Sequence, residues 1–385
     1  MDNQQFEVAI VGGGMVGAAL AVGFAKQGKQ VALIEGFAPS AFSSEQPMDI
    51  RVSAISQTSV DLLSQLDSWP HTKGMRVCPY RRLETWEHPE CRTRFSAESL
   101  QLDQLGFIVE NRLIQLGLWQ EFSHYSNLVT FCPDSMTSMD FGDEGNTLHL
   151  DSGQSIGAQW VLGADGANSK VRELAGIGVT AWDYRQHCML VNVKTELAQQ
   201  DITWQQFTPT GPRSFLPLCG HQGSLVWYDN PTRIRQLVNL EPEKLRDEIL
   251  KCFPQELGDI EVLQAGAFPL TRRHAQTYVA HHCVLVGDAA HTINPLAGQG
   301  VNLGFKDVAA LLAAVEEKGL TAQAMNQYQR TRRCDNLIMQ SGMDVFYKGF
   351  SNDLAPLKFA RNAILKLADQ TGPVKQQVLK YALGL

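Results

Sequence analysis

Two short apolar runs with a glycine-rich turn between them open the chain. Residues 8–11 and residues 31–34 contain no polar side chain, which is typical of strands that are buried on both faces of a parallel sheet. Apolar positions spaced by four predict a helix over residues 18–27, and Gly28 follows it as a helix-ending glycine. The pattern strand, helix, strand predicts a βαβ unit and an α/β fold with a Rossmann-like sheet.

Two further strand-to-helix patterns lie in the second half of the chain. Residues 160–163 and residues 283–286 are apolar runs that predict buried strands, and an Asp-Gly or a Gly-Asp pair follows each of them. After the first run, residues 170–172 open a helix. After the second, apolar residues at alternating spacings of four and three predict a long helix over residues 300–317, closed by Gly319.

The middle of the chain has a different pattern, in which short strands follow one another with turns between them. It predicts a separate β-rich layer that includes one helix, over residues 242–252. The strands expected in this layer span residues 188–194, 202–208, 213–218, 223–228, 260–263 and 267–270.

Composition excludes several classes of protein. The 385 residues carry 33 Lys and Arg against 40 Asp and Glu, a net charge of −7, so no nucleic-acid partner is expected. The eight cysteines form no CxxC pair, which argues against a zinc ribbon or a dithiol redox centre, and no metal site is predicted. The first residues are polar and no apolar run is long enough to span a bilayer, so a cytoplasmic location is expected.

Gly12, Gly14 and Gly17 form a GxGxxG motif in the first strand-to-helix turn. The first glycine permits a tight turn, the second lets the backbone approach a pyrophosphate, and the third lets the helix pack closely on the sheet. The N-terminus of the helix attracts an anion. Glu35 ends the second strand, where a carboxylate accepts hydrogen bonds from an adenosine ribose. Together these features predict a dinucleotide site.

Three motifs then occur in order along the chain. They are this GxGxxG with Glu35, the segment GADGANSKVR at residues 163–172, and the segment GDAAHTINPLAGQGVNLGFKD at residues 287–307. Together they resemble the flavoprotein aromatic hydroxylases, which are single-component FAD monooxygenases related to para-hydroxybenzoate hydroxylase. The resemblance implies resident FAD, with NAD(P)H as a transient co-substrate, because no second dinucleotide motif is visible.

The resemblance also implies roles for individual residues. Asp288 is expected to hydrogen-bond the ribityl chain of FAD, and Asp165 to serve both FAD and nicotinamide binding. Arg51 resembles the family's arginine near the pyrophosphate, and residues 298–302 are expected at the pyrimidine end of the isoalloxazine ring. The full set of expected cofactor-binding residues is Gly12, Gly14, Met15, Val16, Gly17, Glu35, Arg51, Arg112, Asp165, Gly166, Asp288, Pro295, Gly298, Gln299, Gly300, Val301 and Asn302.

The domain organisation follows from the same resemblance. A discontinuous FAD-binding domain is expected, together with a substrate domain whose antiparallel sheet covers the flavin and a C-terminal helical segment. The expected bounds are residues 1–75, 100–182 and 271–345 for the FAD-binding domain, 76–99 and 183–270 for the substrate domain, and 346–385 for the C-terminal segment.

Segments YRRLETW at residues 80–86 and GAFPLTRRH at residues 266–274 resemble the ubiquinone-biosynthesis branch of the family. That branch implies hydroxylation of the ring of a polyprenylated methoxy-benzoquinol with NAD(P)H and O2, through a flavin C4a-hydroperoxide. Two alternatives stay open. One is a flavin-bound, non-catalytic assembly subunit of a quinone-biosynthesis complex, and the other is a hydroxylase that acts at another ring position or on another aromatic. No side chain is assigned as the catalyst.

Histidine and arginine doublets have simpler interpretations. For His291, beside the expected flavin, a hydrogen-bonding role in the cofactor pocket is favoured over that of a catalytic base. His281 and His282 are adjacent, and adjacent strand residues point to opposite faces, so they are interpreted as surface histidines and not as a metal pair. Arg272 and Arg273 are interpreted as a solvated pair.

The end of the chain is basic, unlike the whole. Residues 354–385 carry five basic side chains against one acidic one, interleaved with apolar residues. Such a stretch can lie on an anionic membrane, from which a polyprenyl substrate must be drawn. The alternative is a helical element docked on the FAD-binding domain or on a partner. Peripheral contact with the inner membrane therefore stays open beside a purely cytoplasmic location.

Overall fold

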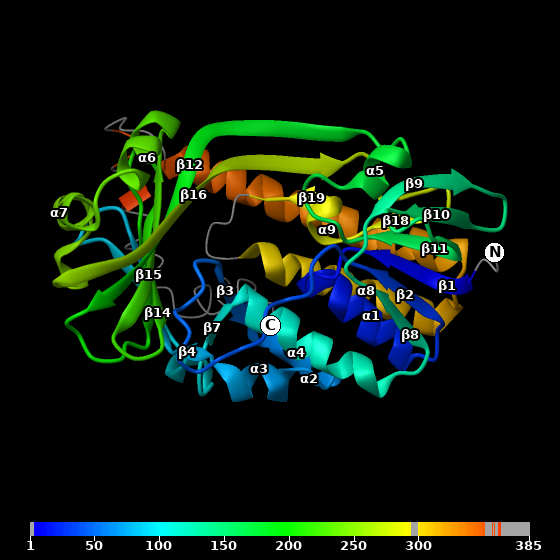
Figure 1. Cartoon of the computed structure of the whole chain (residues 1–385). Helices are drawn as coiled ribbons and strands as arrows, with labels where there is room; N and C mark the ends of the chain where they lie inside the picture. Colours follow the sequence, from blue (N-terminus) through cyan, green and yellow to red (C-terminus); the bar gives the residue numbers. More distant parts are fainter. Residues whose placement is uncertain (1–3, 294–298, 351–355, 357, 359–360, 363–385) are drawn as a thin grey trace.

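Three β-sheets with helices packed around them make up the part of the chain that the computed structural model describes, namely residues 4–293, 299–350, 356, 358 and 361–362. Figure 1 shows one sheet near the N-terminus and another at the far end of the molecule, with two long strands running between them. The arrangement confirms a mixed α/β fold.

The first sheet contains the predicted βαβ unit. β1 (Gln4–Val11) pairs in parallel with β2 (Val31–Ile34) on one side and with β11 (Ser155–Gly163) on the other. All of β2 is buried, as expected of a strand covered on both faces. The other strands of this sheet are β8 (Leu128–Phe131), β9 (Met136–Phe141), β10 (Asn146–Leu150), β17 (Val279–Ala280) and β18 (Cys283–Leu285). The order across it is β17-β18-β11-β1-β2-β8, with β10 joining β11 to β9.

Small residues bring two helices together beneath this sheet. α1 (Met15–Lys26) packs against α8 (Gln299–Lys318) and α4 (Asn111–Glu121). A Cβ on Gly23 of α1 would lie 2.4 Å from Leu312 Cδ1 of α8, so the close approach of the two helices requires a glycine there. The helices predicted over residues 18–27 and 300–317 are thereby confirmed.

The second sheet is built on two unusually long strands. β12 (Val179–Thr195) and β16 (Ile260–Ala275) pair in antiparallel fashion along their whole length. The other strands are β5 (Arg82–Trp86), β6 (Arg92–Ser96), β13 (Ile202–Gln206), β14 (Arg213–Leu218), β15 (Gln222–Asp229) and β19 (His291–Thr292). The order is β19-β16-β12-β15-β14-β13-β5-β6, and all pairs are antiparallel except β13 with β5, which is parallel.

One prediction about this sheet was wrong. Residues 260–263 and 267–270 were expected to form two strands, but they belong to the single strand β16. Gly266 and Pro269 do not end it, because pairing with β12 continues on both sides of them. Pro269 lies opposite His187, next to a register shift in β12, where a residue without an N–H is tolerated.

A small third sheet joins the two larger ones. It consists of β3 (Val52–Ser56), β7 (Gly106–Glu110) and β4 (Cys78–Tyr80). Buried side chains of this sheet share one apolar cluster with Leu218 of β14. Residues between β3 and β4 form α2 (Gln57–Gln65) and α3 (Trp69–Met75). The third sheet therefore forms the apolar seam between the layers.

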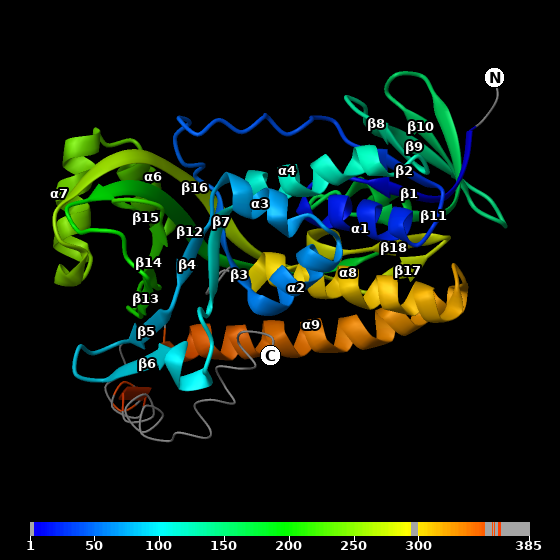
Figure 2. The ribbon, with the colours of Figure 1, turned by 90° about the horizontal axis from the view of Figure 1, so that it is seen from below.

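A long helix, α9 (Ala322–Phe350), runs along the molecule from the first sheet toward β5 and β6 (Figure 2). Gln340 of α9 hydrogen-bonds His274 Nδ1 at 2.9 Å, and Asp344 forms an ion pair with Arg272. Both contacts tie α9 to β16. The remaining helices are α5 (Lys170–Leu174), α6 (Pro231–Val238) and α7 (Pro242–Cys252), with 3-10 turns η1 (Glu98–Leu100), η2 (Phe122–His124), η3 (Gln255–Leu257) and η4 (Gly287–Ala289).

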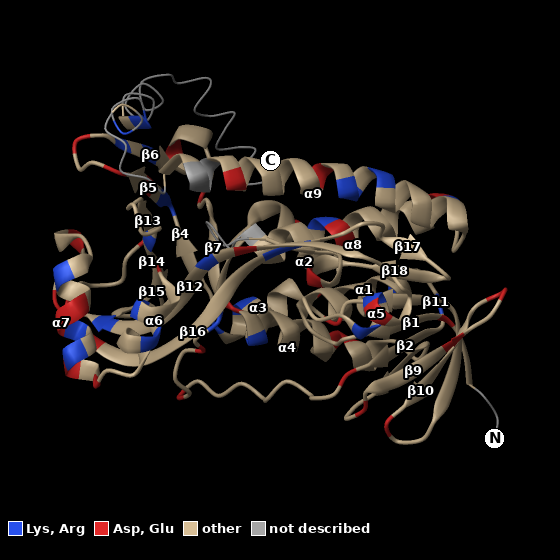
Figure 3. Cartoon of the chain, turned by 90° about the horizontal axis from the view of Figure 1, so that it is seen from above, with Lys and Arg blue, Asp and Glu red and all other residues tan. Residues whose placement is uncertain are grey.

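Charged side chains of both signs are interspersed on α7 and α9 (Figure 3). On α7, Glu248 accepts hydrogen bonds from Lys251 and from Arg233 of α6, so that charge pairing joins the two helices. Among the described residues, no helix is both long and apolar enough to cross a membrane. Most of the basic segment at residues 354–385 lies outside them, and the domain bounds stay a prediction.

Candidate cofactor-binding site

The glycine-rich turn is held so closely that side chains are excluded from it. Gly12 has a φ of +101°, and a Cβ on it would lie 2.5 Å from the carbonyl oxygen of Ala164. A Cβ on Gly17 would lie 1.8 Å from the carbonyl oxygen of Gly12. These two glycines let the turn pack against the end of β11 and let α1 begin directly beneath it.

Gly14 differs from its neighbours. A Cβ on Gly14 would meet no protein atom within 4 Å, so protein packing does not explain this glycine. It is the N-cap residue of α1, it provides no side-chain cap, and the first turn of α1 contains no acidic residue. The N–H groups at this helix end therefore point toward open space, which is the arrangement that a phosphate group fills.

Glu35 holds the same turn from the other side. Its carboxylate accepts hydrogen bonds from Gly13 N at 2.5 Å and Phe37 N at 3.0 Å. Gln115 Nε2 and Trp119 Nε1 of α4 both donate to the Gly13 carbonyl oxygen at 2.8 Å. Sequence reasoning did not find these two α4 side chains, because no pattern in the chain links residues about a hundred positions apart.

The three predicted motifs meet at the start of α1. A Cβ on Gly304 would lie 2.7 Å from Val16 Cγ2, and one on Gly287 would lie 3.3 Å from the same side chain. The Asp-Gly segment arrives from the opposite side, where Asp165 Cα would lie 2.9 Å from a Gly12 Cβ. Segments separated by more than a hundred residues thus form one site.

Asp288 is an exposed residue whose carboxyl group has protein close by. Burial raises the pKa of its carboxyl, against the opposing charges of His291 and Arg51, while the residue itself is exposed. Within the described part of the chain its carboxylate has no hydrogen-bond partner. An acceptor left without a partner fits a hydroxyl-rich ribityl chain. The surroundings of Asp288, Arg51 and the start of α1, where a cofactor is expected, are called the recess below.

Arg51 faces the same recess. Its guanidinium lies 4.3 Å from the centroid of the Phe268 ring of β16, and its charge acts on Asp288. No carboxylate in the described residues forms an ion pair with it. A cation so placed, between the first and second sheets, fits an anionic cofactor, so the residues present here match the requirements of FAD.

Four of the predicted residues are used in contacts within the protein, and Glu35, described above, is one of them. Arg112 donates to Asp49 Oδ2 at 2.9 Å and to the Ser40 carbonyl at 2.7 Å, which fastens the segment before β3 to α4. Asp165 Oδ2 accepts from Lys170 N at 2.7 Å and caps α5, whereas its buried Oδ1 has no partner among the described residues. These side chains shape the loops around the recess.

Asn302 is another predicted cofactor-binding residue whose side chain is used in contacts within the protein. Its Oδ1 accepts from Ser56 N at 3.0 Å and Ser59 Oγ at 2.8 Å, and its Nδ2 donates to the Ala54 carbonyl at 2.8 Å. The side chain thereby clamps the beginning of α8 to β3 and α2. Only its backbone is left to face a ligand.

The remaining predicted residues lie at the beginning of α8. Pro295 and Gly298 are outside the described residues. Gly300 and Val301 belong to the first turn of α8, and among the described residues the nearest atom to a Cβ on Gly300 is Ile293 Cγ1 at 4.0 Å. Gln299 begins the helix. Met15 is the first residue of α1, and Gly166 lies in the turn that follows β11.

A buried polar network behind the recess was missed. His291 Nε2 lies 2.5 Å from Asp307 Oδ2, and Arg332 Nε donates to Asp307 Oδ1 at 2.7 Å. Burial opposes ionisation of Asp307, but His291 and Arg332 lower its pKa to about 2. Gly287 N also donates to Asp307 at 3.1 Å, so the ion pairs position the Gly-Asp turn. His291 hydrogen-bonds Asp307 in this network, and its expected role in the cofactor pocket stays a prediction.

The doublets have different outcomes. His281 and His282 form the turn between β17 and β18, with φ values of 49° and 57°, so they are histidines at a loop end although the strand geometry assumed for them was wrong. No metal-binding group of His, Cys, Asp and Glu is found among the described residues. Arg272 and Arg273 are only partly exposed and have protein partners, because Arg272 pairs with Asp344 and Arg273 donates to the Ala167 carbonyl and to Asn168 Oδ1.

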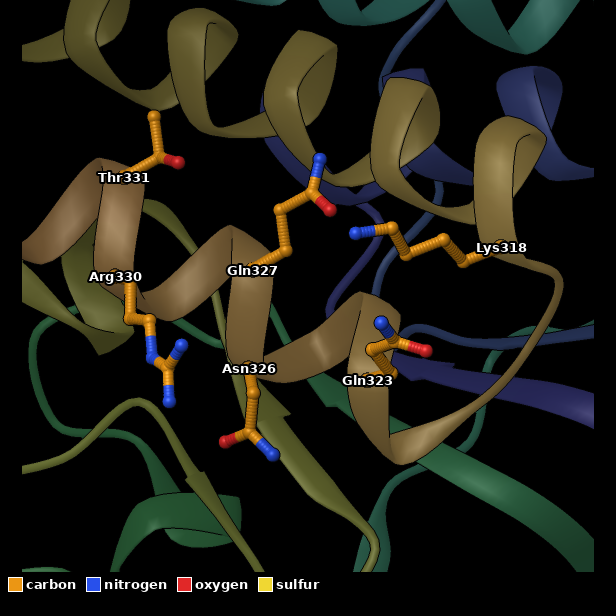
Figure 4. A pocket seen from close by; sticks show the side chains of 6 residues that line it. All are labelled: Lys318, Gln323, Asn326, Gln327, Arg330 and Thr331. Carbon is orange, nitrogen blue, oxygen red and sulfur yellow. The ribbon is translucent and has the colours of Figure 1, made fainter.

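An open depression lies elsewhere, between the end of α8 and the start of α9 (Figure 4). Its lining is polar and consists of Lys318, Gln323, Asn326, Gln327, Arg330 and Thr331. Lys318 ends α8, and a helix of this length spans about 30 Å, so the depression is remote from the recess at the other end of the helix.

Comparison with known proteins agrees with this geometry. An FAD binding domain family model matches residues 134–335. The 3-demethoxyubiquinol 3-hydroxylase of Escherichia coli (strain K12) is 52% identical to this chain, and the match covers 100% of both chains. The ubiquinone hydroxylase UbiL of Rhodospirillum rubrum is 33% identical over 98% of this chain and 89% of the relative.

The fold has solved counterparts as well. The crystal structure of p-nitrophenol 4-monooxygenase PnpA from Pseudomonas putida DLL-E4 superimposes with a TM-score of 0.81 at 18% identity, covering 98% of this chain and 97% of the other. Because the matches run from end to end and include the FAD-binding domain, this chain belongs to the family of FAD-dependent hydroxylases of ubiquinone biosynthesis.

Proposed function

We propose that this protein hydroxylates the ring of 2-polyprenyl-3-methyl-6-methoxy-1,4-benzoquinol, with FAD as resident cofactor and NAD(P)H and O2 as co-substrates. The observation that carries the proposal is the identity of 52% over the full length of a relative named 3-demethoxyubiquinol 3-hydroxylase. The recess between the first and second sheets, bounded by Gly14, Asp288 and Arg51, supports it.

The residues at the recess would hold FAD along its length. The N–H groups at the start of α1 would bind the pyrophosphate in the space beside Gly14, and Glu35 would accept from the adenosine ribose. Asp288 would accept from the ribityl chain. The first turn of α8, at Gly300 and Val301, would donate N–H groups to the pyrimidine end of the ring system.

When bound, FAD supplies the redox chemistry by which NAD(P)H and O2 deliver one oxygen atom to the substrate ring. The protein has to orient the ring and keep water away. Strands β12 and β16 place Phe268 at the edge of the recess, where an aromatic face can pack against a flat ring. The N-terminus of α8 would stabilise negative charge on the ring system, and Arg51 would lie near the pyrophosphate.

A turnover assay tests the proposal. Purified, FAD-loaded protein is incubated with NAD(P)H, the demethoxy-type quinol and 18O2, and the product is analysed by mass spectrometry. We expect one labelled oxygen in the quinol product. If NAD(P)H is consumed without labelled quinol, another aromatic is the substrate, and if no NAD(P)H is consumed, the non-catalytic assembly role takes its place.

A second proposal is that the protein contacts a membrane. The five basic side chains among residues 354–385 and the prenyl tail of the substrate support peripheral binding to an anionic bilayer. Flotation of the full chain with anionic vesicles is compared with that of a variant carrying Lys366→Glu, Lys375→Glu and Lys380→Glu. We expect the wild type to float and the variant to remain below. Equal flotation of the two would leave the tail without this role.

A further inference from the structure

Two thiols from different sheets meet at the seam between the layers. Cys78 belongs to β4 of the third sheet, and Cys219 directly follows β14 of the second. The two side chains belong to one apolar cluster, and Cys219 Sγ lies 3.3 Å from the carbonyl oxygen of Val77, the residue before Cys78. The spacing of cysteines along the sequence gave no indication of this pair, because 141 positions separate its members.

A glutamine side chain holds the two strands at this place. Gln199 Nε2 lies 3.3 Å from Cys78 Sγ and donates to the Leu218 carbonyl at 3.0 Å. Its Oε1 accepts from Gly220 N at 2.6 Å. One amide thus bridges Cys78 to the residues on both sides of Cys219. The position of the two thiols relative to each other is therefore fixed by three contacts from a single side chain.

The two thiols differ in their tendency to ionise. The neighbouring Cys78 thiol, followed by the charge of Arg76, lowers the pKa of Cys219 to about 7, against burial and Glu110. The neighbouring Cys219 thiol and burial raise the pKa of Cys78. Cys78 is 1% exposed, whereas Cys219 is partly exposed. The pair thus combines an accessible thiolate with a buried thiol beside it, which is the arrangement of an attacking and a resolving cysteine.

We propose that Cys219 and Cys78 form a redox modification site that closes into a disulfide between β4 and the end of β14. The oxidant is hydrogen peroxide, which an oxygen-activating flavoprotein can release. The Cys219 thiolate attacks one peroxide oxygen, which gives a sulfenic acid and one water after protonation. The Cys78 sulfur then attacks the sulfenic sulfur, forming the S–S bond and expelling a second water. Two thiols and one peroxide yield one disulfide and two waters.

The bond would act on the seam and not on the cofactor recess. Cys78 and Cys219 lie in the apolar cluster that joins the third sheet to β14, and closing the disulfide would fix these two layers to each other covalently. This inference goes beyond the proposed hydroxylation and does not depend on it, because its test requires only added peroxide and no turnover.

The test is peptide mapping of the full-length, folded protein after brief treatment with hydrogen peroxide near pH 7. We expect a peptide pair joined through Cys78 and Cys219, with two hydrogens lost and both restored by a reductant. Exposed Cys334 of α9 provides the internal reference, and Cys219 is expected to be consumed roughly ten-fold faster, because the Cys78 thiol and the charge of Arg76 favour its thiolate.

Variants identify the order of attack. Cys78→Ser should leave a sulfenic acid on Cys219 that dimedone labels, Cys219→Ser should leave Cys78 unoxidised, and Cys334→Ser should leave the cross-link unchanged. The wild-type map needs no variant to fold. If Cys219 is oxidised no faster than Cys334, or is converted to sulfinic acid without a cross-link to Cys78, the site does not exist.

Discussion

At the scale of single residues, the site depends on its glycines as much as on its charged side chains. Gly12 and Gly17 are required by contacts within the protein, whereas the space beside Gly14 is empty of protein atoms. Asp288 and Arg51 point into the recess without a hydrogen-bonding or ionic partner in the described chain. Residues whose polar groups are paired with one another stabilise the fold, and residues whose polar groups have no partner are available to a ligand.

Gly14→Ala should separate folding from cofactor binding. The added methyl group meets no protein atom, and exchanging glycine for alanine at an N-cap costs at most about 1 kcal/mol. The same methyl group would stand where the pyrophosphate approaches, and loss of a charged hydrogen bond weakens binding roughly 10- to 100-fold. Measuring urea unfolding of the apoprotein and FAD titration of the same sample checks both parts.

Gly74→Ala in α3 is the matched control, because its Cβ also meets nothing within 4 Å. It should change neither quantity appreciably. An unaltered FAD affinity in Gly14→Ala would mean that the pyrophosphate lies elsewhere.

Asp307 should make the stability of the protein depend on pH in the acidic range. Its folded-state pKa of about 2 lies below the unfolded value of about 3.9, so its contribution to stability is present above that value and is lost as the pH falls toward 2. Between pH 6 and pH 3 the wild type should lose roughly 1 kcal/mol more than Asp307→Asn. Urea unfolding at both pH values measures the difference.

Exposed Asp103 supplies the control for this measurement. Asp103→Asn should keep the wild-type loss, because it leaves the pairs of Asp307 with His291 and Arg332 intact. Equal losses in the wild type and Asp307→Asn would show that the ion pairs do not depress the carboxyl pKa.

At the scale of elements, the cofactor site depends on where helices begin. α1 and α8 begin close to each other, since a Cβ on Gly304 would lie 2.7 Å from Val16 Cγ2. The N-cap of α1 is Gly14, which provides no side-chain cap. Each helix is held by contacts from another element. α4 donates to the Gly13 carbonyl, and β3 and α2 grip Asn302.

Asn302→Ala should therefore release the beginning of α8. The change leaves Ser56 N and the Ala54 carbonyl without their partner, and buried groups left unpaired cost roughly 2–4 kcal/mol together. We expect lower stability in urea and, at the same time, weaker FAD binding, since the first turn of α8 is no longer fixed. Asn326→Ala, in the remote polar depression of α9, should affect neither. Loss of stability with unchanged FAD binding would argue that α8 does not contact the cofactor.

At the scale of the whole molecule, contacts between residues that are far apart in the sequence join the layers. Glu87, just after β5, forms a buried ion pair with Arg361, and Asn362 Nδ2 donates to the same carboxylate at 3.0 Å. Residues near the end of the chain are thus attached to the second sheet. Docking was expected on the FAD-binding domain or on a partner, whereas residues 361–362 contact Glu87, in the part of the chain expected to belong to the substrate domain.

Glu87→Gln should loosen that attachment. Removing one partner of a buried pair leaves the other charge uncompensated, at a cost of about 3–5 kcal/mol. Trypsin under native conditions should cut after Arg361 at least ten-fold faster in the variant, and Glu90→Gln, at an exposed position, should behave as the wild type. Equal cleavage rates would indicate that the pair does not retain the segment.

Local sequence patterns predicted helices and strands well, but they failed where contacts with distant segments determine the structure. The βαβ unit, the helix at residues 242–252 and the long helix from residue 300 follow from periodicity, since each element buries one face. The continuity of β16 and the partners of Asp307 could not be foreseen, because β12 and α9 supply them. Arg112 was expected at the cofactor, yet Asp49 and a neighbouring loop already occupy it. The cofactor contacts themselves stay a prediction.

The long pairing of β12 with β16 limits how the molecule can deform. A continuous ladder resists shearing, so bending is expected at its two register shifts, between Asp183 and His187 and between Asn192 and Val193. Phe268, whose ring lies beneath the Arg51 guanidinium, pairs with Cys188 directly beside the first of these shifts. Bending there would move the aromatic ring relative to the arginine while the rest of the ladder keeps its pairing.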